Sequence, residues 1–334
     1  MSGLIRAQAS APPLLSVVVP AYNEAEGLAE LHARVSRTMD AIGELWELVL
    51  VNDGSRDATL AAMERLRAAD PRVAIVNLSR NFGKEIATTA GLDHARGAAI
   101  IILDADLQDP PELIPELVAG WREGYDTVYA QRRRREGETW LKRSTATLFY
   151  RLMGRVGRVE IPADTGDFRL ISRRVVDALT ELREQHRFMK GLFAWVGFPS
   201  KAVPYDRAPR FAGQTKWNYW KLWNLALEGI TSFTIVPLKV ATYLGLAVGL
   251  AAGIYLAEIV IRTLLFGNPI AGYPSLMAVV LFIGGVQLVT LGVMGEYLGR
   301  IFNEVKRRPL YLVERHVPSG TGAEAPARLG EPVA

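Results

Sequence analysis

Short apolar runs alternate with stretches of helical periodicity over the first 130 residues of this 334-residue chain. The runs lie at 14–19, 46–51, 73–78, 98–103 and 127–130, and most are rich in Val, Ile and Leu. Such runs are typical of strands buried on both faces. Strands that alternate with helices predict a parallel, doubly wound α/β sheet. Ligands of these sheets bind beyond the carboxyl ends of the strands.

A different pattern occupies 235–299, where nearly every residue is apolar. No charged residue occurs in 240–257 or in 263–295, and "GNPIAGYP" at 267–274 breaks the stretch as a turn. The lengths predict two membrane helices, about 237–266 and 275–297. A buried hairpin of a soluble protein is the alternative. Basic residues flank the outer ends, so the positive-inside rule places both ends in the cytoplasm.

The segment before the first predicted span is rich in tryptophan. Trp217, Trp220 and Trp223 recur at helical spacing, which favours an interfacial helix on the bilayer over a core helix. The predicted organisation is a disordered N-terminus (1–13), a catalytic domain (14–211), an interfacial amphipathic helix (212–234), two transmembrane helices (235–299) and a cytoplasmic C-terminal tail (300–334).

The amino-acid composition excludes several kinds of catalytic and metal site. The chain has no cysteine, which excludes disulfides, thiolate catalysis and Cys-ligated zinc, and its four histidines are scattered. The N-terminus lacks a signal-peptide pattern, so we expect the first 230 residues to stay in the cytoplasm. The net charge is only +4, but 132–158 holds nine Lys or Arg against two Glu. Basic clusters of this kind bind nucleic acid, phosphate or anionic membranes.

The fourth apolar run ends in two carboxylates, in the stretch "IIILDADLQDPPEL". Alternate residues of an extended segment point the same way, so Asp104 and Asp106 can converge on one hard cation. Mg²⁺ or Mn²⁺ would suit oxygen ligands and hold phosphate oxygens as well. The first strand is not followed by G-x-G-x-x-G and the chain has no P-loop, so neither phosphate-binding fingerprint supports this sheet.

Six ordered motifs give the chain a specific resemblance. "VVVPAYNEAEGL", "VNDGSRDAT", "SRNFGKE", "LDADLQDPPE", "DTGDFRLISR" and "FAGQTKW" occur in the order seen in glycosyltransferase family 2. With the apolar C-terminus, the chain resembles the polyisoprenyl-phosphate glycosyltransferases over about 16–309. This resemblance implies a GT-A (Rossmann-like) α/β domain with interfacial helices, followed by a two-helix transmembrane hairpin. Many relatives have D-D-G-S where this chain has Asn52 first, a departure we expect to be tolerated.

The resemblance also implies roles for individual residues. Those expected to bind the nucleotide sugar are Pro20, Tyr22, Glu24, Asp53, Lys84 and Asp104, and those expected to bind Mg²⁺ or Mn²⁺ are Asp104, Asp106 and Gln108. Those expected at the acceptor phosphate are Arg132, Arg143, Thr147, Arg210 and Lys216. Asp167 and Arg169 are the expected catalytic residues; Asp167 is either a base, a ligand of a sugar hydroxyl or a group that orients Arg169.

The implied reaction is inverting transfer of a sugar from a nucleotide sugar, by bacterial analogy a UDP-sugar, to undecaprenyl phosphate. The implied place is the cytoplasmic face of the inner membrane, with a homo-oligomer possible by resemblance and no nucleic acid partner. A processive polysaccharide synthase is the nearest alternative, but it needs more spans and a Q-x-x-R-W motif that this chain lacks. A non-catalytic membrane adaptor is disfavoured by the intact Asp104/Asp106 pair and the intact "TGDFRL". Nothing in the sequence selects the sugar, and a GDP-sugar is the alternative to a UDP-sugar.

Overall fold

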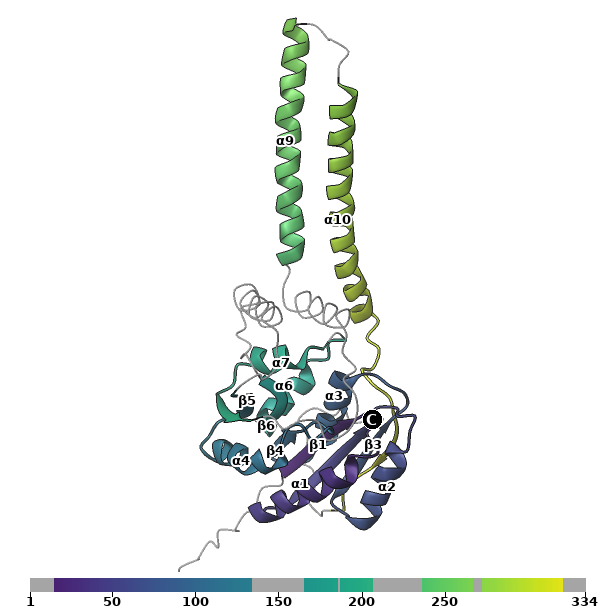
Figure 1. The fold of residues 1–334 in the computed structure, drawn as a ribbon, viewed down its shortest axis with the longest axis vertical. Coiled ribbons are helices and arrows are strands. Elements are labelled where there is room, and N and C mark those ends of the chain that lie inside the picture. The colour runs from purple at the N-terminus through teal and green to yellow at the C-terminus, as the bar shows by residue number, and fades with distance from the viewer. Residues whose placement is uncertain (1–14, 134–164, 186, 207–235, 267–271, 321–334) are drawn as a thin grey trace, which may run out of the picture. The chain divides into compact units, whose positions relative to one another are not determined.

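The computed structural model describes residues 15–133, 165–185, 187–206, 236–266 and 272–320. These residues divide into two compact units (Figure 1). One unit contains every strand of the described residues and the last described segment, 309–320. The other contains the two long helices that precede this segment.

The described strands form one mixed sheet in the order β7-β5-β6-β4-β1-β2-β3-β8. Their bounds are Leu15–Ala21 (β1), Trp46–Asn52 (β2), Val73–Leu78 (β3), Ala99–Ile102 (β4), Thr127–Arg132 (β5), Thr165–Ser172 (β6), Ser200–Tyr205 (β7) and Val313–Val317 (β8). The five strands predicted from the apolar runs are all present and run in the same direction.

The five predicted strands run parallel, but the sheet as a whole is mixed. Strand β6 pairs antiparallel with both β4 and β5, and β8 pairs antiparallel with β3. Parallel neighbours require a crossover, which a single helix usually provides. That alternation of strand and helix ends with β5 in the sequence, so it could not predict the direction of β6 and β8.

Helices cover both faces of the sheet, as a doubly wound fold requires. Figure 1 shows one face covered by α1 (Leu28–Ile42), α2 (Thr59–Ala69) and α4 (Ile114–Arg122), which follows the short helix η1 (Pro111–Leu113). The other face carries α3 (Lys84–His94), α6 (Arg173–Glu181) and α7 (Met189–Trp195).

Alternate strand residues supply the two apolar layers. Val17 and Leu48 belong to the core with α1, whereas Val18 and Val51 face α3, where Gly91 allows close approach. A Cβ on Gly91 would lie 2.3 Å from Val18 Cγ1. Because both faces are buried, the carboxyl ends of the strands are the part of the sheet that can bind ligands.

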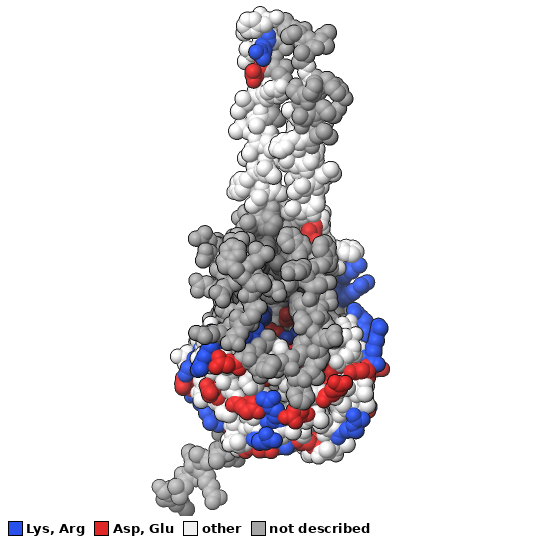
Figure 2. Space-filling view, in the orientation of Figure 1, with Lys and Arg blue, Asp and Glu red and all other residues white. Residues whose placement is uncertain are grey.

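The second unit consists of α9 (Val236–Phe266, 31 residues) and α10 (Tyr273–Val305, 33 residues). The predicted helices at 237–266 and 275–297 are therefore confirmed as helices. Residues Phe282–Val305 are long and apolar enough to cross a membrane, and Val240–Tyr255 is a shorter apolar stretch. On the face shown in Figure 2, α9 and α10 are almost free of charge, whereas the strand-bearing unit carries both signs. The predicted interfacial helix lies outside the described residues.

The segment after α10 belongs to the sheet. Strand β8 lies in the predicted C-terminal tail and pairs with β3, with Val76 opposite His316. Tyr311 donates a hydrogen bond of 2.7 Å to Asp93 on α3. Ser319 Oγ donates one of 2.6 Å to Glu47, a carboxylate that is only 1% exposed. The sheet therefore contains a strand that the predicted domain bounds of 14–211 do not include.

Candidate active site at the carboxyl ends of the strands

The loops after β1 and β2 are bound to each other. Asn23 N–H donates to Ser55 Oγ at 3.0 Å, and Glu24 N–H donates to Thr59 Oγ1 at 2.9 Å. Asn23 has a φ of 55°, a left-handed conformation that asparagine tolerates better than most residues. Three of the predicted nucleotide-binding residues lie on the first of these loops or on the strand that leads into it: Pro20, Tyr22 and Glu24.

Asp53 joins this pair of loops to the loop after β3. Its carboxylate is buried and accepts hydrogen bonds from Phe82 N–H at 2.7 Å, Gly83 N–H at 3.0 Å and Asn81 Nδ2 at 2.9 Å. Burial raises the pKa of Asp53, and the backbone donors partly offset the rise. Asp53 thus fixes the loop, and its contact with a nucleotide base stays a prediction.

Gly54 shows how closely these loops approach. It has a φ of 61°, and a Cβ there would lie 2.3 Å from the carbonyl carbon of Arg80. Only glycine fits both the conformation and the space.

Lys84, the first residue of α3, connects two carboxylates from different strands. Its Nζ donates to the Asp104 carboxylate at 2.7 Å and to Asp167 Oδ2 at 2.5 Å. Asp104 follows β4 and Asp167 lies on β6. Both oxygens of Asp104 lie within reach of Lys84 Nζ, whereas buried Asp167 Oδ1 has no hydrogen-bond partner among the described residues. The structure therefore brings together three predicted site residues and leaves one acceptor oxygen, on Asp167, without a partner.

The charges set the protonation of this cluster. Burial alone would raise the pKa of Asp167, but Lys84, Lys190 and Arg169 together lower it below the usual range. Burial raises the pKa of Asp104, with Asp167 adding to the rise and Lys84 opposing it. The two carboxylates raise the pKa of Lys84 although burial opposes them. Asp167 is therefore a weak base that stays ionised.

The residues predicted to bind a metal lie in the turn after β4. Asp106 Oδ1 accepts the Gln108 N–H at 3.2 Å, and Leu107 between them has a φ of 56°. No group of three or more His, Asp or Glu side chains in the described part of the chain could hold an ion by itself. Asp104 and Asp106 supply carboxylate oxygens, the donors that a hard cation prefers, and its other ligands would come from a substrate, which is how Mg²⁺ is usually bound beside phosphates.

Arg132 lies at the end of β5, in a cluster that includes a tyrosine not predicted from sequence. Its Nε donates to Tyr205 Oη at 3.3 Å, and the Tyr205 hydroxyl donates to buried Asp109. Burial and the Asp109 carboxylate raise the pKa of Tyr205 to about 12. The other predicted acceptor-phosphate residues, Arg143, Thr147, Arg210 and Lys216, lie outside the described residues.

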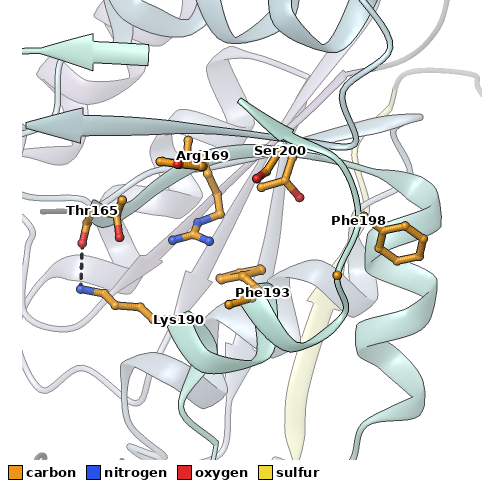
Figure 3. A pocket seen from close by; sticks show the side chains of 10 residues that line it. Thr165, Arg169, Lys190, Phe193, Phe198 and Ser200 are labelled. Carbon is orange, nitrogen blue, oxygen red and sulfur yellow. Dashed lines mark hydrogen bonds between the residues drawn. The ribbon is translucent and has the colours of Figure 1, made fainter. Parts of the chain in front are cut away.

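A cavity of about 190 Å³ lies between β5, β6, β7 and α7 (Figure 3). Arg169 is 5% exposed, its guanidinium lies 4.0 Å from the centre of the Phe193 ring, and its Nη2 donates to Gly166 O at 2.9 Å. Burial lowers the pKa of Arg169 to about 10. Lys190 on α7 donates to Thr165 O at 3.1 Å. Two cations thus line the cavity beside Asp167.

Glu85 and Lys190 are members of this charged cluster that sequence reasoning missed. Glu85 follows Lys84 and accepts a hydrogen bond from Met189 N–H at 3.3 Å, which ties α7 to α3. Burial and the Asp167 carboxylate raise the pKa of Glu85 to about 7. The adjacent "KE" in "NFGKE" was the available signal for Glu85, whereas nothing in the sequence around Lys190 pointed to this site.

Comparisons with known proteins give the family. Residues 16–180 match the model of glycosyl transferase family 2, and residues 236–301 match that of the GtrB C-terminal hairpin. An uncharacterized glycosyltransferase from Synechocystis sp. is 56% identical over 299 residues, which is 90% of this chain and 94% of the relative. A bactoprenol glucosyl transferase from Shigella phage SfII is 49% identical over 301 residues, 90% of this chain and 97% of the relative.

Among solved structures, mannosyl-3-phosphoglycerate synthase from Rubrobacter xylanophilus is 17% identical, with a TM-score of 0.46 over 65% of this chain and 71% of that chain. The family assignment rests on the sequence relatives and the two matching models. The chain is an enzyme that belongs to glycosyltransferase family 2, in the group of polyisoprenyl-phosphate glycosyltransferases.

Proposed function

We propose that the enzyme transfers a sugar from a nucleotide sugar, a UDP-sugar, to undecaprenyl phosphate at the cytoplasmic face of the inner membrane. The name of the Shigella phage relative supports a polyprenyl acceptor. The observation that carries the proposal is the cluster in which Lys84 joins Asp104 and Asp167. The cluster lies at the carboxyl ends of the parallel strands, beside the loops assigned to the nucleotide.

Asp104, Asp106 and Gln108 are the residues that would hold Mg²⁺ or Mn²⁺. Such an ion, when bound, neutralises negative charge on a leaving diphosphate. Lys84 adds a second positive charge on the same side. The loops that Asp53 joins, with Pro20, Tyr22 and Glu24, would hold the nucleoside.

The transfer is a single displacement with inversion at the anomeric carbon. An oxygen of the acceptor phosphate attacks this carbon, the bond from carbon to the diphosphate oxygen breaks, and the electron pair leaves with the nucleoside diphosphate. A phosphate monoester has a second pKa near 6, so at neutral pH the acceptor needs no proton removed. The low pKa of Asp167 agrees with a positioning role rather than a base.

Arg132 is the described residue suited to the acceptor phosphate, because a guanidinium binds phosphate oxygens through two parallel hydrogen bonds. We assign Arg143, Thr147, Arg210 and Lys216 to the same task on resemblance. The helices α9 and α10 would both span the membrane, which holds the enzyme where its lipid acceptor is found.

A panel of UDP- and GDP-sugars tests the proposal with the purified full-length enzyme and undecaprenyl phosphate. We expect one labelled sugar to appear in a butanol-soluble lipid, released from UDP, with the β or α linkage opposite to that of the donor. Elongation of a water-soluble polymer instead would identify a processive synthase. Retention of configuration would overturn the displacement mechanism.

A further inference from the structure

A directed chain of hydrogen bonds runs from the C-terminal strand to the loop after β2. Asn77 on β3 donates through Nδ2 to Glu314 Oε2 on β8 at 2.8 Å. Asn52 on β2 donates through Nδ2 to Asn77 Oδ1 at 2.7 Å. Asn52 Oδ1 accepts the Ser55 N–H at 3.2 Å. Asn52 and Asn77 are only 3% and 5% exposed, so water cannot readily replace the bond between the two amides.

The two ends of this chain fix the orientation of both amides. A backbone N–H can only donate, so Ser55 requires the oxygen of Asn52. A carboxylate can only accept, so Glu314 requires the nitrogen of Asn77. With both ends set, the middle bond from Asn52 to Asn77 has one possible direction. Asn52 thus has a role as a donor that an aspartate at this position could not perform.

The chain ends in the loops proposed to hold the nucleotide. Ser55, whose N–H is bound by Asn52, accepts the Asn23 N–H beside Tyr22 and Glu24. The segment that contains β8 makes a second hydrogen bond nearby, in which Leu312 O accepts the Ser79 N–H at 3.0 Å. Ser79 begins the loop whose Asn81, Phe82 and Gly83 bind Asp53.

We infer that Glu314, through β8, is a positioning residue of the nucleotide half of the site. It touches no substrate; it fixes the amides of Asn77 and Asn52 and so the loop at Ser55. The inference rests on the proposed function, since it concerns the loops assigned to the nucleotide. It also assigns a role in donor binding to a segment that follows both C-terminal helices in the sequence.

The test compares variants of the full-length enzyme by their Kd for UDP, measured by isothermal titration calorimetry with Mn²⁺ present, and by their KM and kcat. Glu314→Ala removes the terminal acceptor, and we expect the Kd for UDP and the donor KM to rise about threefold to tenfold, the range for one lost hydrogen bond. The kcat should change little. Glu314→Gln keeps an acceptor oxygen and should restore most of the affinity.

Arg315→Gln is the matched control. Arg315 is the next residue of β8 and pairs with Glu64 on α2, outside the chain of amides, so the variant should bind UDP like wild type.

A pair of substitutions that exchanges donor and acceptor between residues 77 and 314 gives a sharper test. Asn77→Asp places a second acceptor against Glu314 and should weaken UDP binding, whereas adding Glu314→Gln supplies a donor and should recover it.

Equal Kd values for wild type, Glu314→Ala and Asn77→Asp would overturn the inference while leaving the proposed function intact. The same loss in Arg315→Gln would also overturn it, because the effect would then come from the strand and not from Glu314. If wild type bound neither UDP nor GDP, the proposed function and this inference would both fail.

Discussion

The two halves of the sheet differ in the charge and the hydrogen-bond partners of their buried polar groups. In the half formed by β1, β2, β3 and β8, the polar groups near the loops are mostly neutral amides and hydroxyls with matched partners. Asn52 and Asn77 are examples. Two buried carboxylates of this half also have several donors, because Asp53 accepts three hydrogen bonds and Glu47 accepts from Ser16, Arg96 and Ser319.

The half formed by β4, β5 and β6 holds a concentration of charge instead. Lys84 bridges Asp104 and Asp167, Glu85 lies close by, and Arg169 forms no ion pair with a carboxylate in the described part of the chain. Asp167 keeps a buried oxygen without a hydrogen-bond partner among the described residues. Each unsatisfied buried group costs about 1–3 kcal/mol.

This difference indicates that the first half of the sheet serves as a scaffold and that the second half provides the reactive groups. A half whose polar groups are satisfied internally holds its shape before a ligand arrives. A half with unmet acceptors is stabilised when a cation or a donor group fills them, and perturbed charges of this kind gather at functional sites. We therefore expect substitutions in the charged half to affect turnover most and those in the matched half to affect nucleotide affinity or stability.

The largest effect should come from the metal. Treatment with EDTA, or Asp106→Ala, should lower sugar transfer to below about 1% of the wild-type rate, because charge stabilisation of this kind contributes a hundredfold or more. Added Mn²⁺ or Mg²⁺ should restore the treated enzyme but not the variant. Glu116→Ala, at an exposed carboxylate on α4, is the control and should keep full activity. Full transfer in metal-free buffer would contradict a metal-dependent site.

The next effect concerns Asp167. Asp167→Asn should lower turnover about a hundredfold, the lower range for a positioned group, while UDP binding is kept. Because its pKa is already lowered in the folded enzyme, Asp167 should remain ionised across pH 5–9. Wild type and variant should then follow the same pH profile, that of the acceptor phosphate near pH 6. A wild-type rate that falls with an aspartate-like pKa absent from the variant would establish a base instead.

The stability of the fold also depends on Asp167, and the sign of its pH dependence follows from the lowered pKa of this carboxyl. A folded-state pKa below the unfolded value of about 3.9 stabilises the enzyme above that pH. The contribution is lost as the pH falls below it. Acid unfolding of wild type should therefore begin as the pH drops below about 4, and Asp167→Asn should lack this part of the pH dependence.

A stability effect should follow removal of β8. A chain that ends at Arg308 loses the Tyr311–Asp93 and Ser319–Glu47 hydrogen bonds and leaves β3 as an open edge. We expect its free energy of unfolding to fall by about 2–4 kcal/mol, from several bonds of about 1 kcal/mol each. A chain that ends at Gly320 keeps the strand and should unfold like wild type in urea. Equal stability of both truncations would make β8 dispensable.

Tyr205→Phe should give the smallest effect. It removes the hydroxyl that donates to buried Asp109 and accepts from Arg132. We expect a loss of about 1–3 kcal/mol in unfolding free energy, the cost of a buried acceptor that loses its donor. The KM for the lipid acceptor should rise severalfold because Arg132 loses an anchor. Tyr125→Phe, at a half-buried tyrosine between α4 and β5, is the control and should change neither the unfolding free energy nor the KM for the lipid acceptor.

Much of the fold followed from the sequence because buried parallel strands are continuous apolar runs. Strands β1 to β5 were predicted for this reason. Strand β8 was not, because its sequence "VERHV" carries three polar residues, as edge strands often do. Strand β7 begins with an exposed Ser and a half-buried Lys and was missed in the same way.

A residue of the candidate site could be predicted where it belongs to a recognisable motif. It could not be predicted where its contact depends on how two strands pair. Lys84, Asp104 and Asp167 each follow from a motif at a strand end. The bond from Asn77 to Glu314 joins residues 237 positions apart, and only the register between β3 and β8 brings them together. Neutral amides also have no sequence pattern that marks them as partners.

One binding measurement tests the central claim most directly, which is that the carboxylates of the charged half serve a cation shared with the donor. The Kd of UDP is measured by calorimetry at increasing Mn²⁺ for full-length wild type and for Asp104→Asn. We predict that Mn²⁺ strengthens UDP binding to wild type by about tenfold or more, equal to about 1.4 kcal/mol, and does not affect the variant. UDP binding to wild type that is equally tight with and without Mn²⁺ would contradict the account.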